Sequence, residues 1–406
     1  MQRKIITGLF FLLLGVRPFL SSLVLPKEDI AYSFLLIVTC LLLLGKDILA
    51  WRKNPLFFYF ILWLGALLLS VIFSKNFENS LSQFYKYAAY TAVFFTVCAL
   101  GKDKKKVILI VLLTSCSLLS FYALRWFLYG TLYTIDYLTR HHSSWDFAFE
   151  YLSRGRAFFP FVTPAALGGY LILFAPLSIA FLFAKNQTAR PLDFSLSVKN
   201  ILNLLAVISI TLALLATQSL GAIFSLLLAT AVLIFRRRRN MKMSLLLWIV
   251  LPFAIFLPFL FILRNSNAHF FNLPSFSLAN RFSYWEHAMG LIIQHPLVGL
   301  GPGNYPFFKS ISPHNSYLQV WAETGIFGLT ALISIFYRVL KVDFAAKAGS
   351  ERIIYESLWI GNLAFIIHNL ADLTLFLPEI FLLWWVNAAL MNTAGESVSL
   401  KNDRGL

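Results

Sequence analysis

Charged side chains are scarce in this sequence, and acidic ones are the scarcest. Only 13% of the 406 residues are charged, with 18 acidic against 34 basic, whereas 59% are hydrophobic. The helices of a soluble protein of this length would alternate apolar and polar faces, whereas the hydrophobic runs of this sequence are apolar all round. The sequence is therefore not that of an ordinary soluble enzyme. Cysteine is also rare. Cys40, Cys98 and Cys116 lie in hydrophobic runs, with spacings that suit neither a disulfide nor a metal site.

Apolar runs of about 20 residues, each long enough to cross a bilayer as a helix, repeat along the chain. We predict an all-α polytopic membrane protein with twelve transmembrane helices in a single integral membrane domain, residues 1–406. The predicted spans are residues 5–24, 30–45, 55–73, 83–100, 106–127, 164–184, 199–216, 219–235, 243–263, 316–338, 353–373 and 375–393.

Lysine and arginine are distributed unevenly around these spans. With both termini in the cytoplasm, 23 of the 34 basic residues fall in cytoplasmic segments. This pattern follows the positive-inside rule, so the net charge of +16 indicates membrane topology, and we expect membrane lipids and no nucleic acid as partners. It places two long loops, residues 128–163 and 264–315, on the periplasmic side.

Polar and turn-forming residues are densest at residues 281–328. The segment begins with Arg281, contains a Gly/Pro cluster that includes Gly301 and Gly303, and reaches His314 and Asn315 where the predicted tenth span begins. Irregular backbone in a membrane protein is costly unless it lines a wet cavity. We therefore look for the functional site here.

His314 is the first candidate in this segment. At a helix N-terminus the macrodipole disfavours an imidazolium, so the ring stays neutral at pH 7 and can accept a proton. The alternative is an ordinary loop histidine beside Asn315 and Ser316, which are residue types that commonly cap helices.

Arg281 is the second candidate. It opens a stretch in which Phe282, Trp285, Met289 and Ile292 recur at helical spacing, which predicts a helix at the outer membrane interface. An arginine there can simply contact lipid headgroups. The functional alternative is that its planar guanidinium binds a diphosphate through two hydrogen bonds.

The first long loop holds a second group of cations, among them Arg154 and Arg156. The excess of cations fits an anionic ligand, although solvated loop charge is the commoner explanation of such residues. His141, His142 and Asp146 also lie here, but adjacent histidines rarely converge on one ion and no metal-binding spacing is present. We expect neither a metal nor a cofactor.

His368 and Asp372 are four positions apart at the outer end of the predicted eleventh span, so a continuous helix would place them on one face. An ionisable pair in a membrane segment is a candidate site. The alternative is a structural pair that joins two helices. For Glu323, inside the tenth span, we expect packing against another polar helix.

Three motifs along residues 281–328 together resemble a known family. They read Arg-x-x-x-Trp at 281–285, Pro-Leu-x-Gly-x-Gly-x-Gly-x-Tyr at 296–305, and His-Asn-x-Tyr-Leu-Gln-x-x-x-Glu-x-Gly-x-x-Gly at 314–328. This pattern is similar to that of the O-antigen ligases and O-antigen polymerases of the bacterial envelope.

The resemblance implies a fold like that of the GT-C membrane glycosyltransferases and metal-independent glycosyl transfer on the periplasmic face of the inner membrane. The donor would be a glycan on undecaprenyl diphosphate, and the acceptor a sugar hydroxyl on lipid A-core or on another glycan. His314 would take the hydroxyl proton and Arg281 would bind the diphosphate. The expected substrate-binding residues are Arg154, Arg156, Asn315, Tyr317, Gly301, Gly303, His368 and Asp372.

The chain departs from the family at one position. Family members commonly carry Ser-Arg-Gly where this sequence reads Ser219-Leu220-Gly221, so an expected diphosphate contact is missing. Either Arg154 or Arg156 replaces it from the first loop, or the chemistry is altered.

Two other functions stay open. A polymerase that joins two carrier-linked glycans shares the motifs, although we favour the ligase. A transporter would also have many spans with polar residues, but carriers usually break helices at corresponding positions of two halves. We find no such symmetry in this sequence.

The predicted topology can be tested in whole cells. In a background without native cysteines, Ser266→Cys and Lys309→Cys should react with a membrane-impermeant thiol reagent in intact spheroplasts. Labelling that appears only after lysis would contradict the periplasmic placement of residues 264–315.

Overall fold

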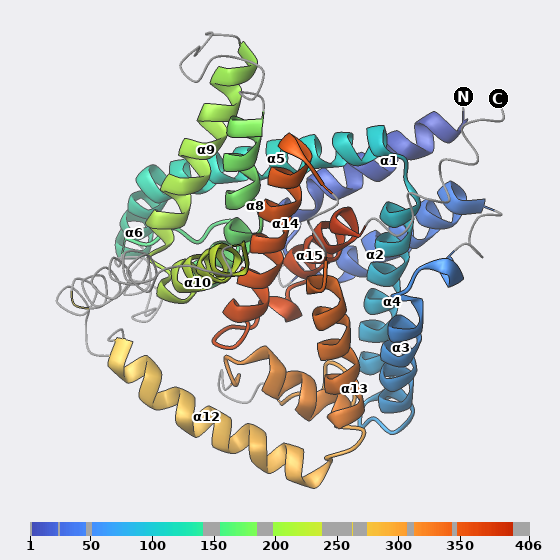
Figure 1. The fold of residues 1–406 in the computed structure, drawn as a ribbon. Helices are drawn as coiled ribbons and strands as arrows, with labels where there is room; N and C mark the ends of the chain where they lie inside the picture. The colour runs from blue at the N-terminus through green and yellow to red at the C-terminus, as the bar shows by residue number, and fades with distance from the viewer. Residues whose placement is uncertain are drawn as a thin grey trace. The chain divides into compact units, whose positions relative to one another are not determined.

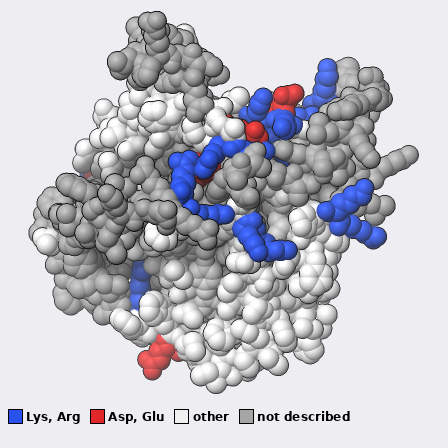
Figure 2. All heavy atoms as spheres, viewed as in Figure 1, with Lys and Arg blue, Asp and Glu red and all other residues white. Residues whose placement is uncertain are grey.

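The computed structural model describes residues 2–22, 25–45, 51–140, 155–184, 198–237, 262, 274–306, 312–342 and 347–392. All of its regular elements in these ranges are helices, which confirms the predicted all-α class (Figure 1). Among the residues that the structure describes, five helices are long and apolar enough to cross a membrane. On the face drawn in Figure 2, most of the described Lys and Arg side chains lie across the upper and middle part, and the described atoms at the lower right form a broad uncharged area, as expected of a surface that meets lipid.

The chain divides into two compact units. The first unit comprises residues 1–112, 279–346 and 369–406, and the second comprises residues 113–278 and 347–368. The twelve predicted spans stay a prediction, because the ninth, residues 243–263, lies almost wholly outside the described residues.

The first unit is built around α4. Its elements are α1 (Gln2–Val16), η1 (Arg17–Phe19), α2 (Pro26–Leu44), α3 (Phe57–Ile72), α4 (Phe77–Ala99), α13 (Ser316–Leu340), η6 (Thr374–Phe376) and α15 (Pro378–Met391). α4 packs against α2, α3 and α15, and α3 also packs against α13. Buried rings fill the space between them: Phe60 lies 4.7 Å from Phe94 and 5.1 Å from Trp385, centroid to centroid. Such contacts make the aromatic side chains the main apolar content of this core.

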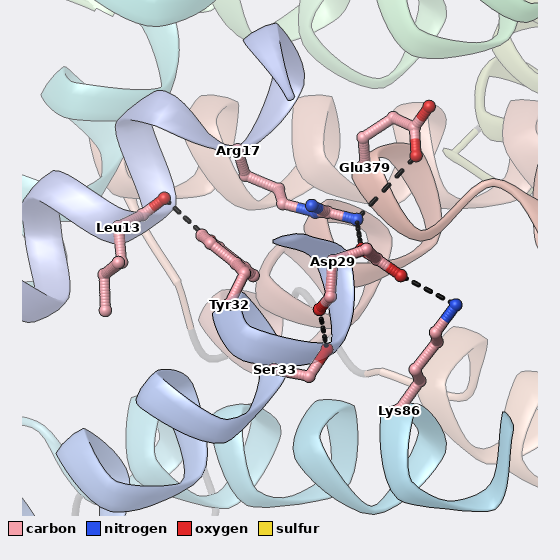
Figure 3. A network of polar contacts seen from close by, with 7 residues as sticks. All are labelled: Leu13, Arg17, Asp29, Tyr32, Ser33, Lys86 and Glu379. Carbon is pink, nitrogen blue, oxygen red and sulfur yellow. Dashed lines mark hydrogen bonds and ion pairs between the residues drawn. The ribbon is translucent and has the colours of Figure 1, made fainter. Parts of the chain in front are cut away.

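The first unit also buries a group of four ionised side chains (Figure 3). Arg17 Nη2 lies 2.5 Å from Asp29 Oδ1 and 3.7 Å from Glu379 Oε2, while Lys86 Nζ lies 2.7 Å from Asp29 Oδ2. Each of the four residues is at most 8% exposed. Because two cations balance two carboxylates, the charges are compensated where water is excluded. The group joins the end of α1 to α2, α4 and α15.

The second unit is organised around α8 and α14. Its elements are α5 (Lys102–Arg125) from residue 113 on, η3 (Trp126–Gly130), α6 (Thr131–Arg140), α8 (Pro164–Ala184), α9 (Val198–Thr217), α10 (Leu220–Arg237) and α14 (Gly349–His368). α14 packs against α8 and α10, and α8 packs against α9. Arg237 at the end of α10 and Arg352 at the start of α14 both pair with Glu356. This pairing agrees with the predicted topology, which puts both helix ends on one side.

Several helix boundaries differ from the predicted ones. α1 ends at Val16 instead of continuing to residue 24, because Pro18 has no N–H for a continuing helix and the chain turns into η1. α5 continues through the single π-turn η3 into α6, which ends at Arg140. The first part of the segment 128–163, predicted as a loop, is therefore helical.

The predicted tenth span, residues 316–338, is not one straight helix. α13 breaks at Gly325, whose φ of 66° and ψ of −174° belong to a backbone region open essentially to glycine alone. The residues before and after the break form two arms that leave it in different directions (Figure 1). The rings of Tyr317 and Phe336 lie only 6.4 Å apart, although a straight helix would separate them by about 28 Å.

The buried ion group should contribute strongly to the stability of the first unit. Asp29→Asn would leave Arg17 and Lys86 without their shared carboxylate, and breaking a buried pair in this way typically costs about 3 to 5 kcal/mol. We expect a marked fall in the unfolding temperature of the purified protein in detergent. Glu28→Gln removes an exposed carboxylate one residue earlier and is the control. Equal stability of the two variants would contradict this role.

Candidate functional site

Arg281, His314 and Asp372 lie within electrostatic range of one another in the first unit. Burial lowers the pKa of His314 below its ordinary value of 6.5; the negative charge of Asp372 opposes this shift and the positive charge of Arg281 adds to it. Burial also lowers the pKa of Arg281, and Asp372 opposes that shift as well. The histidine is therefore neutral at pH 7, with a cation and an anion nearby. The structure thus brings together the two candidates of the polar segment.

Arg281 is presented by α12 (Pro274–Gln294), which confirms the predicted helix. Trp285 Nε1 donates a hydrogen bond of 2.9 Å to the Pro313 carbonyl, and the Tyr284 ring lies 6.0 Å from the His314 ring. α12 thereby contacts the segment that carries the histidine.

The apolar residues predicted at helical spacing lie along one side of α12 but are buried to different degrees. Ile292 is buried at 2% exposure, whereas Phe282 and Met289 are 67% and 39% exposed. A helix turns 100° per residue, so these positions span an arc of about 80°, and Ile292 lies at the edge nearest the buried Ala288. The exposed side is the one available to lipid.

His314 stands directly before α13, as predicted. Its φ of 44° is left-handed, and the next residue, Asn315, is the N-cap, whose Oδ1 accepts hydrogen bonds from the N–H groups of Tyr317 and Leu318. The capping alternative is therefore correct for Asn315. The positive end of the α13 dipole lies beside the imidazole and favours its neutral form.

Asn369 was missed by sequence reasoning, and it fixes the start of α13. Its Oδ1 accepts hydrogen bonds from Ser316 Oγ at 2.7 Å, Thr374 Oγ1 at 3.0 Å and Leu375 N at 2.9 Å. The Ser316 N–H donates to the carbonyls of Asn369 and Asp372. In the sequence, Asn369 is a single amide side chain between two apolar runs. Its position alone does not show which residues it binds by hydrogen bonds.

The expectation that His368 and Asp372 share a helix face is wrong. α14 ends at His368, and Asp372 lies in the turn that follows, where its Oδ1 accepts a hydrogen bond from Leu373 N at 2.7 Å. His368 belongs to the second unit, where its Nε2 lies 3.2 Å from the Ala165 carbonyl. The helix stops because carbonyl groups of this turn accept the hydrogen bonds of Ser316 instead of continuing the helical ladder.

Gly301 and Gly303 lie in a loop that is held against α4 and α13. Both have positive φ, 99° and 77°. Ser80 Oγ donates to the Pro302 carbonyl at 3.0 Å, and Asn79 Nδ2 donates to the Gly303 carbonyl at 2.6 Å. The glycines therefore have a clear structural role, and their predicted binding of substrate stays a prediction.

Arg156 lies in the second unit at the end of α9. Its Nε donates to the Thr217 carbonyl at 2.9 Å and its Nη2 to the Gln218 carbonyl at 3.4 Å. These two residues immediately precede Ser219-Leu220-Gly221, the position of the missing family arginine. Of the two predicted replacements, Arg156 thus lies next to this position.

The other residues of the first loop that were singled out, Arg154, His141, His142 and Asp146, lie outside the described residues. Within the part of the chain that the structure describes, no group of three or more His, Cys, Asp or Glu side chains could hold a metal ion.

Comparison with known proteins bears on the same region. Residues 204–333 match the family model described as O-antigen ligase, and this match confirms the resemblance noted from the motifs. The chain carries an O-antigen ligase family domain. The matched residues run from α9 to the second arm of α13 and include both Arg281 and His314.

A Haemophilus influenzae protein described as uncharacterized is 27% identical to the chain over 127 residues. The alignment covers 25% of this chain and 32% of that protein, so the chain spans about a third of the length of the curated relative it matches.

The electrostatics of this candidate site can be measured directly. In a histidine NMR titration of the detergent-solubilised protein, His314 should titrate below pH 6.5. Asp372→Asn should lower its pKa further, because the carboxylate is the charge that opposes the shift. Glu286→Gln, an exposed carboxylate on α12, should leave the pKa unchanged. A His314 pKa that rises in Asp372→Asn would contradict the arrangement.

Proposed function

We propose that this protein is a glycosyltransferase of the O-antigen ligase type in the bacterial inner membrane. It moves a glycan from an undecaprenyl diphosphate carrier to a sugar hydroxyl of lipid A-core on the periplasmic face. The observation that carries this proposal is the grouping of Arg281, His314 and Asp372 at the start of α13, because Arg281 and His314 lie inside the region that matches the ligase family.

The reaction needs a base for the acceptor hydroxyl. The hydroxyl oxygen bonds to the anomeric carbon of the donor sugar, the bond from that carbon to the diphosphate oxygen breaks, and the hydroxyl proton is removed. His314 is neutral at pH 7 and takes this proton. The Asp372 carboxylate stabilises the imidazolium that forms, because its charge favours the protonated ring.

The reaction also needs a cation for the departing diphosphate. Arg281 Nε is buried and, among the described residues, has no hydrogen-bond partner. A buried donor without a partner is costly in a folded protein, so a ligand that accepts from it gains affinity. The guanidinium can bind a phosphate group through two parallel hydrogen bonds, as an ammonium cannot.

Several further residues are proposed to bind the substrates. Arg156 supplies a guanidinium next to Leu220, where other family members carry arginine, and it stays a proposed substrate-binding residue. Arg154, Asn315, Tyr317, Gly301, Gly303 and His368 stay proposed substrate-binding residues.

The proposed transfer should not require a divalent metal. The diphosphate is a good leaving group, so positioning and cationic side chains suffice for its departure. Transfer by purified protein should survive excess EDTA. Loss of transfer on chelation with rescue by Mg²⁺ or Mn²⁺ would contradict the proposal and return attention to His141, His142 and Asp146.

Substitutions at the two central residues test their roles. His314→Ala should lower the transfer rate by about 10² to 10⁴, the usual contribution of general acid–base catalysis, while donor binding persists. His314→Asn can hydrogen-bond but cannot take a proton at neutral pH, so it should be equally slow. Arg281→Lys keeps the charge but loses the planar fork, so both donor binding and transfer should weaken.

The control is Glu286→Gln, a change at an exposed position on α12 that should leave transfer at the wild-type rate. Retained transfer in His314→Ala would overturn the catalytic assignment. Retained transfer in His314→Asn alone would make His314 an orienting residue. Wild-type activity in Arg281→Lys would leave only the lipid headgroup role for the arginine.

A further inference from the structure

The loop at residues 299–305 contacts α13 close to the break at Gly325. Most of its hydrogen bonds to α13 involve Glu323. The Leu300 N–H donates to the Ala322 carbonyl and the Gly301 N–H donates to the Glu323 carbonyl, both at 2.9 Å. Ser70 Oγ, on α3, donates to the same Glu323 carbonyl at 2.8 Å. On the other side of the break, the Ile326 N–H donates to the Pro296 carbonyl at 2.9 Å. The main chain of Glu323 thus contacts both the loop and α3.

The side chain of Glu323 makes a second set of contacts with the same loop. Its Oε2 accepts the Gly303 N–H at 2.8 Å, and its Oε1 accepts Gln319 Nε2 at 2.9 Å. The Tyr305 N–H also donates to this carboxylate. Glu323 is 1% exposed, so these donors replace the water that an ionised carboxylate would otherwise need. We expected Glu323 to pack against another polar helix. Its carboxylate instead accepts hydrogen bonds from the loop backbone.

The loop in turn supports α12. Tyr305 is packed in a buried cluster with Ala288 and Ile292 of α12 and Ala322 of α13. Ala288 lies two turns of helix beyond Arg281, on the buried side of the same helix. A shift of Tyr305 therefore shifts the part of α12 that carries the arginine.

Glu323 also lies at the end of the short arm of α13 that begins beside His314. The start of this arm is fixed by Ser316 and Asn369, and its end is fixed by Glu323. The two groups of the candidate site, on α12 and before α13, are thus held by contacts that meet at one buried carboxylate.

We propose that Glu323 is a positioning residue that sets the distance between Arg281 and His314 by holding the loop 299–305 between α12 and α13. The inference rests on the proposed function. It assigns no direct contact with substrate to Glu323.

The test compares Glu323→Gln with Glu286→Gln, which makes the same change at an exposed position of α12. An amide at 323 replaces one of the two accepting carboxylate oxygens with an NH2 donor, so at one of these positions a donor faces a donor. A misplacement of about 1 Å can cost about 10²-fold in rate, and we expect Glu323→Gln to lose at least about tenfold in kcat. Glu286→Gln should keep the wild-type kcat.

The pH profile separates positioning from stability. His314 faces Arg281 and Tyr284 of α12 and Asp372 of the turn after α14, and among these Arg281 holds its pKa down. If Arg281 moves away from His314, the pKa of His314 rises. The acid limb of the plot of kcat against pH should therefore shift to higher pH in Glu323→Gln. Loss of folded protein lowers the rate equally at every pH and leaves the limb in place.

Each outcome decides the proposal. Wild-type kcat in Glu323→Gln, or a lower kcat with an unmoved acid limb, would overturn it. If Glu323→Gln does not accumulate as folded protein, Glu323→Asp keeps the buried charge but withdraws the carboxylate from Gly303, and the same two results are required of it. If His314→Ala is active, the proposed function itself has failed. If His314→Ala is inactive while both Glu323 variants match wild type, only the present inference has failed.

Discussion

The break in α13 at Gly325 is the constraint on which the candidate site depends. A helix that stops inside a membrane protein frees backbone N–H and C=O groups, and lipid offers them no partners. Here the loop 296–301 supplies those partners through the carbonyl of Pro296 and the N–H groups of Leu300 and Gly301. A Cβ at residue 325 would lie 2.0 Å from the Leu297 carbonyl oxygen, so only glycine permits this approach. The break fixes the loop, and the loop supports α12.

The first unit stabilises its buried acidic side chains in two ways. In the group around Asp29, two cations balance two carboxylates, and the net charge of the group is zero. At Glu323 a single carboxylate is bound by backbone and amide N–H groups, and none of these described partners is a cation. Both arrangements satisfy a buried charge, but only the second ties a loop to a helix. Arg281 also retains a buried Nε–H without a hydrogen-bond partner among the described residues, as Arg17 does, but no carboxylate among these residues forms an ion pair with Arg281 at contact distance.

Much of the site could be predicted from sequence because its residues are close together in the chain. The helix at Arg281, the N-terminal position of His314 and the capping by Asn315 all follow from local patterns. The break in α13 was missed because Thr324-Gly325 sits in an apolar run, where a glycine is compatible with a helix. Asn369 and the backbone contacts of Glu323 were missed because their partners lie far away in sequence, and one sequence shows no such pairing. The end of α14 at His368 was missed for the same reason, since the turn that follows it is held by Ser316.

The most direct test of the account is a transfer assay with the purified wild-type protein in proteoliposomes. The donor is a labelled glycan on undecaprenyl diphosphate, and the acceptors are lipid A-core and a second carrier-linked glycan, supplied separately. If the protein is a ligase, we expect a new glycosidic bond to lipid A-core and the release of undecaprenyl diphosphate in equal amount. Extension of the carrier-linked glycan alone would identify a polymerase instead. Passage of the labelled glycan across the vesicle membrane with no new bond to either acceptor would contradict the central claim and indicate a transporter.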